Sequence, residues 1–144
     1  MRFTKMHGIG NDYLFINCFD EYVSDPSRLA LQMCRDHTGV GADGIVLIEP
    51  GESSPFAMRI YNRDGSEAEM CGNAVRCIGK YVYERGLTRE TEFTLGTKSG
   101  LREVKLHVMD GKVVDVTVDM GTPVLEPEKI PVLLPGEMVL RHRL

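Results

Sequence analysis

The spacing of apolar residues predicts two helices, over residues 26–36 and 72–85. In the first helix, Asp25 is a suitable N-cap and Pro26 fits the first helical position. In the second helix, apolar residues recur at helical spacing up to Gly86, which favours a helix end. Cys77 widens the apolar stripe of this second helix, so we expect it to be largely buried.

Alternating or short continuous apolar runs predict seven strands around these helices. The strands cover residues 2–6, 13–19, 45–49, 57–62, 92–95, 101–109 and 112–119. Several strands around one buried helix indicate an α+β domain with a sheet that curls about that helix.

The last two strands form the clearest hairpin, and its loop length sets the register. A two-residue loop, Asp110-Gly111, would place Leu106 opposite Asp115 and put the two apolar faces on opposite sides. A three-residue loop that includes Met109 pairs Leu106 with Val114 instead, and Val104 with Val116. Because the buried face selects the register, the three-residue loop with a left-handed Gly111 is predicted.

The chain changes character after Gly121, where four prolines follow at positions 123, 127, 131 and 135. This pattern is typical of a linker or an edge segment. We therefore expect a domain over residues 1–121 and a Pro-rich segment over residues 122–144 that leads toward a second domain. Residues 137–144 alternate like the start of a strand without a clear stop, which suggests a truncated chain.

Composition limits the function classes. The chain has 144 residues, 42% of them hydrophobic, and a net charge of −4 without a basic block, so a nucleic-acid partner is not expected. Residues 1–8 lack the apolar stretch of a signal peptide, and no run reaches the length of a membrane span. These features predict a cytoplasmic protein with no membrane contact.

The four cysteines lie at positions 18, 34, 71 and 77. Their spacing does not match a zinc site, and no export signal supports disulfides, so we expect neither a metal nor a cystine. Cys18, Cys34 and Cys77 fall on strand-like or apolar helical positions and are expected to pack as small core residues.

Cys71 is different because it directly precedes the second helix. Ser, Thr, Asp or Asn would cap a helix better, so a cysteine there favours a functional interpretation. The helix N-terminus favours a thiolate, which can act as a nucleophile or take a proton. Gly72 would let a ligand approach the backbone closely, and an anion there could accept N–H bonds from the helix start.

Three loops carry further candidate chemistry. Residues 39–44 have the glycine spacing of a dinucleotide-binding turn, but they follow a helix and lead into a strand, so a tight structural loop is favoured. Residues 7–12 are interpreted as a loop between the first two strands, and His7 or His37 is a weaker candidate for a base. Asn62 could hold a polar substrate near the thiol, although Asp64-Gly65 beside it is also an ordinary turn signal.

Together, these stretches resemble the diaminopimelate epimerase family. The matching segments are residues 5–13 (KMHGIGNDY), 37–44 (HTGVGADG) and 59–73 (RIYNRDGSEAEMCGN), while residues 118–123 (VDMGTP) are similar to the segment that closes the family's first domain. Some members carry a glutamine where this chain has Gly44, so no substrate contact is transferred to that position.

The resemblance implies an amino-acid epimerase that interconverts LL- and meso-diaminopimelate in lysine and peptidoglycan biosynthesis without a cofactor. It implies two pseudo-symmetric halves, each a curled, mostly antiparallel sheet around a central helix, with one thiol base from each half. By this resemblance Cys71 is one base, and Asn11, Asn62, Gly72 and Asn73 are substrate-binding. Full-length relatives are expected to be homodimers.

No cysteine follows Cys77, so the family's second base has no counterpart in this sequence. We therefore expect a half-enzyme, inactive alone, whose partner is the missing domain that supplies the second cysteine. Two alternatives stay open: a racemase of another amino acid on the same fold, or a non-catalytic binding domain. An accessible, reactive Cys71 would favour an enzyme, and an inert one the binding domain.

Overall fold

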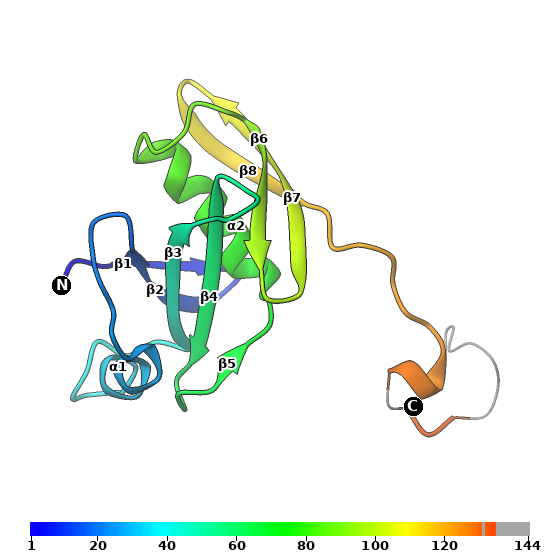
Figure 1. The fold of residues 1–144 in the computed structure, drawn as a ribbon, viewed down its shortest axis with the longest axis horizontal. Coiled ribbons are helices and arrows are strands. Elements are labelled where there is room, and N and C mark those ends of the chain that lie inside the picture. The colour runs from blue at the N-terminus through cyan, green and yellow to red at the C-terminus, as the bar shows by residue number, and fades with distance from the viewer. Residues whose placement is uncertain (131, 135–144) are drawn as a thin grey trace.

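The computed structural model describes residues 1–130 and 132–134 (Figure 1). Its helices are α1 (Pro26–Met33), α2 (Gly72–Glu84) and the 3-10 turn η1 (Pro127–Lys129). Its strands are β1 (Thr4–Gly8), β2 (Asn11–Asn17), β3 (Gly44–Pro50), β4 (Phe56–Asn62), β5 (Glu67–Ala68), β6 (Glu92–Thr97), β7 (Gly100–Met109) and β8 (Lys112–Val118). Both predicted helices are confirmed, as are the seven predicted strands with shifted ends, whereas the two-residue strand β5 was not predicted.

The strands form one sheet in the order β1-β2-β3-β4-β6-β7-β8, with β5 paired to β4. Only the pairs β2–β3 and β4–β6 are parallel among the described strands, and a helix lies within each of these two connections. This is expected, because parallel neighbours need a crossover whereas antiparallel neighbours can be joined by a short turn. The predicted α+β fold with a mostly antiparallel sheet is confirmed.

The sheet curls around α2 (Figure 1). Helix α2 contacts β1 at one end of the sheet and β7 and β8 at the other, whereas α1 lies against β3 and β4. The two faces of β2 therefore enter different apolar cores. Tyr13 and Phe15 pack in the core with α2, and Leu14 and Ile16 pack in the core with α1. Burial on both faces explains why β2 and β3 are nearly continuous apolar runs.

The first hairpin is tighter than the sequence suggested. Gly8 pairs with Asn11, so the turn consists of Ile9 and Gly10 alone, which have φ values of 54° and 83°. Two positive φ angles are typical of the two-residue turns that match strand twist. The prediction of a loop over residues 7–12 is therefore wrong, and Asn11 is fixed as the first residue of β2.

The predicted register of the β7–β8 hairpin is also wrong. Met109 pairs with Lys112, so the loop has two residues, and Leu106 pairs with Val116 rather than Val114. A register shift between His107 and Val108 adds the one residue that the shorter loop lacks. A bulge of this kind adds one residue to a strand and reverses which side chains face the core beyond it. The apolar faces are thereby matched without a longer loop.

Residues 122–130 of the Pro-rich segment lead away from the sheet (Figure 1). They contain η1, and the bounds of the segment as a separate unit stay a prediction. The strand-like pattern over residues 137–144 lies outside the described residues. Among the residues that are described, no helix combines the length and the apolar character that crossing a bilayer would need.

Candidate active site

Cys71 is the N-cap residue of α2, as the sequence predicted. Its backbone is extended, with φ −144° and ψ 112°, and its side chain makes no capping hydrogen bond. The thiol is partly exposed. The first N–H groups of a helix have no partner within that helix, so this sulfur lies beside the positive end of the α2 dipole.

The β1–β2 hairpin places Asn11 against this thiol. A Cβ atom on Gly8 would lie 3.0 Å from the Cβ of Asn73, so the hairpin packs directly on the first turn of α2. Asn11, which pairs with Gly8, donates from Nδ2 to the Sγ of Cys71 over 3.6 Å. The structure therefore brings Asn11 to Cys71, which lies 60 residues later in the sequence, and to the neighbouring Asn73.

Tyr13 belongs to the apolar core against which Cys71 packs, and the sequence analysis did not identify it as a site residue. Burial raises the pKa of the Tyr13 phenol to about 12, and the negative charge of a Cys71 thiolate acts in the same direction. A hydrogen bond from Asn11 opposes this rise. Asn11 and Tyr13 are two residues apart in β2 and so face the same side, which is the signal that could have indicated Tyr13.

The other predicted site residues lie around the helix start in different ways. The Oδ1 of Asn73 accepts a hydrogen bond from Nη2 of Arg76 one turn later. Gly72 lies under Met120, whose Sδ would be 3.2 Å from a Cβ at this position. Asn62 ends β4, and its Nδ2 donates to Oγ of Ser66 at 3.0 Å.

Asn62 is nevertheless at the same end of the sheet as Asn11. Tyr13 pairs with Gly44 across β2 and β3, and Gly44 pairs with Asn62 across β3 and β4. The side chain of Asn62 is engaged by Ser66, so the structure places Asn62 near the site by register and not by a contact with the thiol.

The glycine-rich loop over residues 39–44 serves the fold. The N–H groups of Gly39, Val40 and Gly41 donate to carbonyls of the last turn of α1 and the residues that follow it, Met33 and Arg35. These N–H groups therefore end a helix instead of presenting themselves to a phosphate, in agreement with the structural interpretation.

The remaining cysteines differ from Cys71 in their surroundings. All four cysteines are unbridged. Cys34 and Cys77 are buried core residues, as predicted, and Cys18 is half-buried against the core of α1. Burial raises the pKa of Cys18 to about 11 and also raises the pKa values of Cys34 and Cys77. Within residues 1–130 and 132–134, no group of three His, Cys, Asp or Glu side chains is placed to hold a metal.

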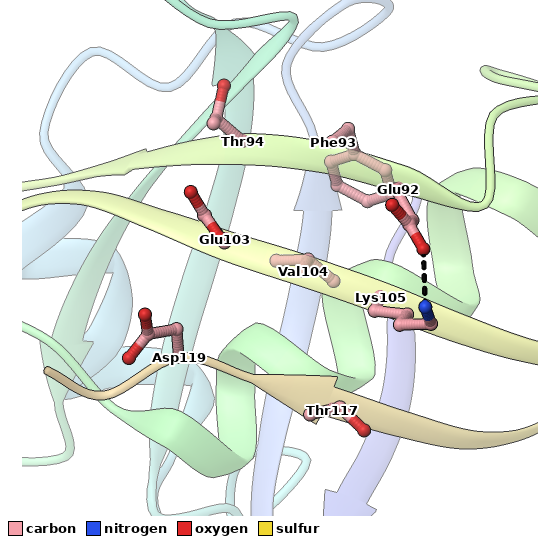
Figure 2. A pocket seen from close by; sticks show the side chains of 8 residues that line it. All are labelled: Glu92, Phe93, Thr94, Glu103, Val104, Lys105, Thr117 and Asp119. Atoms are coloured by element: carbon pink, nitrogen blue, oxygen red, sulfur yellow. Dashed lines mark ion pairs between the residues drawn. The ribbon is translucent and has the colours of Figure 1, made fainter.

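A hollow of about 530 Å³ lies elsewhere, on the outer surface of β6, β7 and β8. Figure 2 shows carboxylates of Glu92, Glu103 and Asp119 around it, with Lys105 paired to Glu92 at 2.6 Å. Cys71 and Asn11 do not line this hollow. The start of α2 and this hollow are therefore separate features.

Comparison with known proteins identifies the family of the chain. A family model described as "Diaminopimelate epimerase" matches residues 3–126. The chain belongs to the diaminopimelate epimerase family.

Relatives within this family are similar over most of the chain. It is 55% identical over 132 residues to the diaminopimelate epimerase of Acetivibrio thermocellus, covering 92% of this chain and 47% of that protein. It is 57% identical over 125 residues to the diaminopimelate epimerase of Phocaeicola vulgatus, covering 87% of this chain and 45% of that protein. This member of the family thus spans about half the length of the curated relatives it matches.

Solved structures confirm the fold. A probable proline racemase from Agrobacterium radiobacter aligns with a TM-score of 0.66 at 18% identity, over 81% of this chain and 40% of that one. A hydroxyproline epimerase from Agrobacterium vitis aligns with a TM-score of 0.63 at 18% identity, again over 81% and 40%. At this identity the likeness concerns the fold and not the substrate.

Proposed function

We propose that this chain supplies one thiol base and part of the substrate site of an epimerase that interconverts LL- and meso-diaminopimelate without a cofactor. The observation that carries the proposal is the thiol of Cys71 at the N-terminus of α2, with the Asn11 amide 3.6 Å from its sulfur. Membership of the diaminopimelate epimerase family supports the choice of substrate. The proposed setting is lysine biosynthesis in the cytoplasm, with which four unbridged cysteines are consistent.

In the proposed reaction, the Cys71 thiolate removes the α-proton of the substrate from one face. The proton moves to Sγ, and the electron pair stays on the α-carbon as a carbanion. A second thiol then gives its proton to the opposite face. The α-proton of an amino acid is very weakly acidic, so the site must stabilise the carbanion electrostatically in a pocket closed to water.

The start of α2 is suited to the substrate carboxylate. The backbone N–H groups of Gly72 and Asn73 would donate to it, and the dipole of α2 favours its negative charge. A charge at a helix end is typically stabilised by about 0.3–1 kcal/mol. Asn11 and Asn62 would add neutral amide donors, which orient a polar substrate without competing for the proton. Because the dipole contribution is small, further groups must contribute to the complete site.

We propose that the second base comes from outside this sequence. Cys18, Cys34 and Cys77 are poor candidates, because each of them packs in or against one of the two apolar cores. The chain spans about half of its curated relatives, so the corresponding second half would provide the opposite thiol. The complete enzyme is expected to be a homodimer.

The test is incubation of LL-diaminopimelate with the chain in D₂O, followed by measurement of α-deuterium and of the meso isomer. The chain alone should not invert the substrate, whereas a mixture with the second half of the Acetivibrio thermocellus relative should. Cys71→Ser should reduce that activity by roughly 10²- to 10⁴-fold, the range for loss of a general base. Cys18→Ser is the matched control and should retain activity.

Four results would overturn parts of the proposal. Inversion by the chain alone that Cys71→Ser abolishes would mean that the site is complete without a second half. Inversion by the mixture that survives Cys71→Ser would remove Cys71 from the mechanism. Turnover of another amino acid in preference to diaminopimelate would favour a racemase on the same fold. A Cys71 thiol that is neither alkylated nor protected by substrate would favour a non-catalytic binding domain.

A further inference from the structure

Asp43, the residue directly before β3, is hydrogen-bonded to the chain on both sides of that strand. Its carboxylate Oδ2 accepts from the backbone N–H of Asp12 at 3.0 Å, and its own N–H donates to the carbonyl of Asp12 at 2.9 Å. Its carbonyl accepts from the N–H of Arg63 at 2.9 Å. The strands β2, β3 and β4 are neighbours in the sheet (Figure 1), so Asp43 joins the start of β2 to the residue that follows β4.

The two residues that Asp43 holds are the chain neighbours of the two asparagines that we propose bind substrate. Asp12 follows Asn11, and Arg63 follows Asn62. A shift of Asp12 must move Asn11, because consecutive residues share a planar peptide unit. Asp43 is therefore placed to set how far apart two amide side chains from different strands lie.

Asp43 and its partner Asp12 are themselves held in place. Ala42, directly before Asp43, is 6% exposed and packs in the core with α1. The Nζ of Lys5 lies 2.9 Å from Oδ2 of Asp12 and also donates to the carbonyl of Gly41. This ammonium group opposes the repulsion between the two neighbouring carboxylates. The carboxylate of Asp43 thus acts from a fixed loop and not from a free one.

We propose that Asp43 is a positioning residue, whose carboxylate fixes the start of β2 so that the amide of Asn11 stays at the sulfur of Cys71. This inference rests on the proposed function for the role of Asn11 as a donor to substrate. A carboxylate is a stronger acceptor for a backbone N–H than a neutral group is, which suits it to this task. Asp43 acts through the backbone of Asp12 and does not itself touch substrate.

The first experiment follows the side-chain amide signal of Asn11 by NMR in the ¹⁵N-labelled chain without substrate. Cys71→Ala should shift this signal, because the hydrogen bond from Nδ2 to the sulfur is lost. In an Asp43→Ala background the same substitution should leave the signal in place, because Asn11 has already moved away from the sulfur. Asp43→Asn keeps an acceptor oxygen and should restore the response.

Asp25→Ala is the matched control. The carboxylate of Asp25 also accepts from a backbone N–H at 3.0 Å, that of Arg28 at the start of α1. Loss of this cap destabilises the helix, but the Asn11 signal should respond to Cys71→Ala as it does in the unchanged chain. The control thereby separates a loss of stability from a loss of position. A full response in a folded Asp43→Ala variant would overturn the proposal.

A measurement on the unchanged chain covers the case in which Asp43→Ala does not fold. The N–H of Asp12 should exchange with solvent deuterium more slowly than in an unstructured peptide of the same local sequence, because the carboxylate of Asp43 holds it. Exchange at the peptide rate would mean that this hydrogen bond does not fix β2, and the proposal would fail.

The second experiment tests whether the loss reaches the substrate. In the mixture with the second half of the Acetivibrio thermocellus relative, Asp43→Ala should raise KM for LL-diaminopimelate about tenfold, the effect of one hydrogen bond, and change kcat by less than about twofold. Asp43→Asn should restore KM, and Asp25→Ala should leave it unchanged. An unchanged KM for Asp43→Ala would contradict the positioning role.

The two experiments separate this inference from the proposed function. Absence of turnover by the unchanged mixture would overturn the epimerase proposal. The Asn11 signal involves no substrate, so it would still decide whether Asp43 holds Asn11 at Cys71.

Discussion

At the scale of single residues, the absence of a side chain at Gly44 allows a close approach of Tyr61 and Tyr13. A Cβ atom there would lie 2.3 Å from the carbonyl oxygen of Tyr61 and 2.9 Å from Cε1 of Tyr13. Neither the backbone carbonyl nor the ring is the end of a flexible side chain, so neither can move aside easily. At Gly72, by contrast, the added atom would meet only the thioether of Met120, which can move. The two glycines therefore tolerate substitution differently.

This difference predicts unequal effects of two alanine variants on stability. Gly44→Ala should lower the free energy of unfolding by about 2 kcal/mol, because overpacking forces backbone or ring shifts. Gly72→Ala should change it by less than about 0.5 kcal/mol, because alanine favours a helix and Met120 can turn aside. Urea unfolding followed by circular dichroism measures both. An equal decrease in the free energy of unfolding for the two variants would contradict the close contact at Gly44.

At the scale of elements, the edge strand β8 is held by a bulge and by the last turns of α2. The Nζ of Lys80 donates to the Val113 carbonyl at 2.9 Å, and Oε1 of Glu84 accepts from the Val113 N–H at 3.0 Å. Lys80 and Glu84 also pair with each other at 2.6 Å, and this ion pair lowers the pKa of Glu84. These contacts satisfy backbone groups that an edge strand would otherwise leave open to pairing.

The bulge predicts which of two adjacent valines matters for stability. Val113 is 5% exposed and Val114 is 60% exposed. Val113→Ala should therefore cost about 2 kcal/mol through lost burial and a cavity, whereas Val114→Ala should stay within about 0.5 kcal/mol. Chemical denaturation of the two variants gives the comparison. A larger loss of stability for Val114→Ala than for Val113→Ala would instead support the three-residue loop and its register.

At the scale of the whole molecule, the two cores keep several acidic groups in their neutral form. Burial raises the pKa of Cys18 to about 11 and of Tyr13 to about 12, and it also raises the pKa values of Cys34 and Cys77. In the unfolded chain a thiol ionises near ~8.5 and a phenol near ~10. Above these values the unfolded state holds fewer protons than the folded state, so stability must fall as pH rises.

The predicted result is a urea midpoint that is steady between about pH 7 and 8 and then falls from about pH 9 up to 11 or 12. Cys34→Ala removes one of the buried thiols and should flatten the fall. Tyr22→Phe, at a side chain that is 85% exposed, should leave the slope as it is. A midpoint that stayed constant to pH 11 would mean that these groups ionise in the folded protein as they do in the unfolded chain.

The sequence by itself determined the features that depend on neighbours along the chain. The helical spacing and the cap residues located α1 and α2, and the position of Cys71 before Gly72 placed a thiol at a helix start. The alternation of apolar residues located the seven longer strands, and their number around one buried helix indicated the fold class. Each of these inferences uses local geometry, which repeats every two residues in a strand and every 3.6 in a helix.

The tertiary structure alone decided how distant segments meet. Asn11 lies 60 residues before Cys71, and the contact between them exists because the β1–β2 hairpin closes at Ile9 and Gly10 and packs on α2. The placement of Tyr13 on Gly44 and the bulge in the last hairpin have the same origin. Side-chain packing between strands and helices selects one register and one ring position among several that the local pattern allows equally. The surroundings of Cys71 therefore follow from packing, and the thiol itself follows from the sequence.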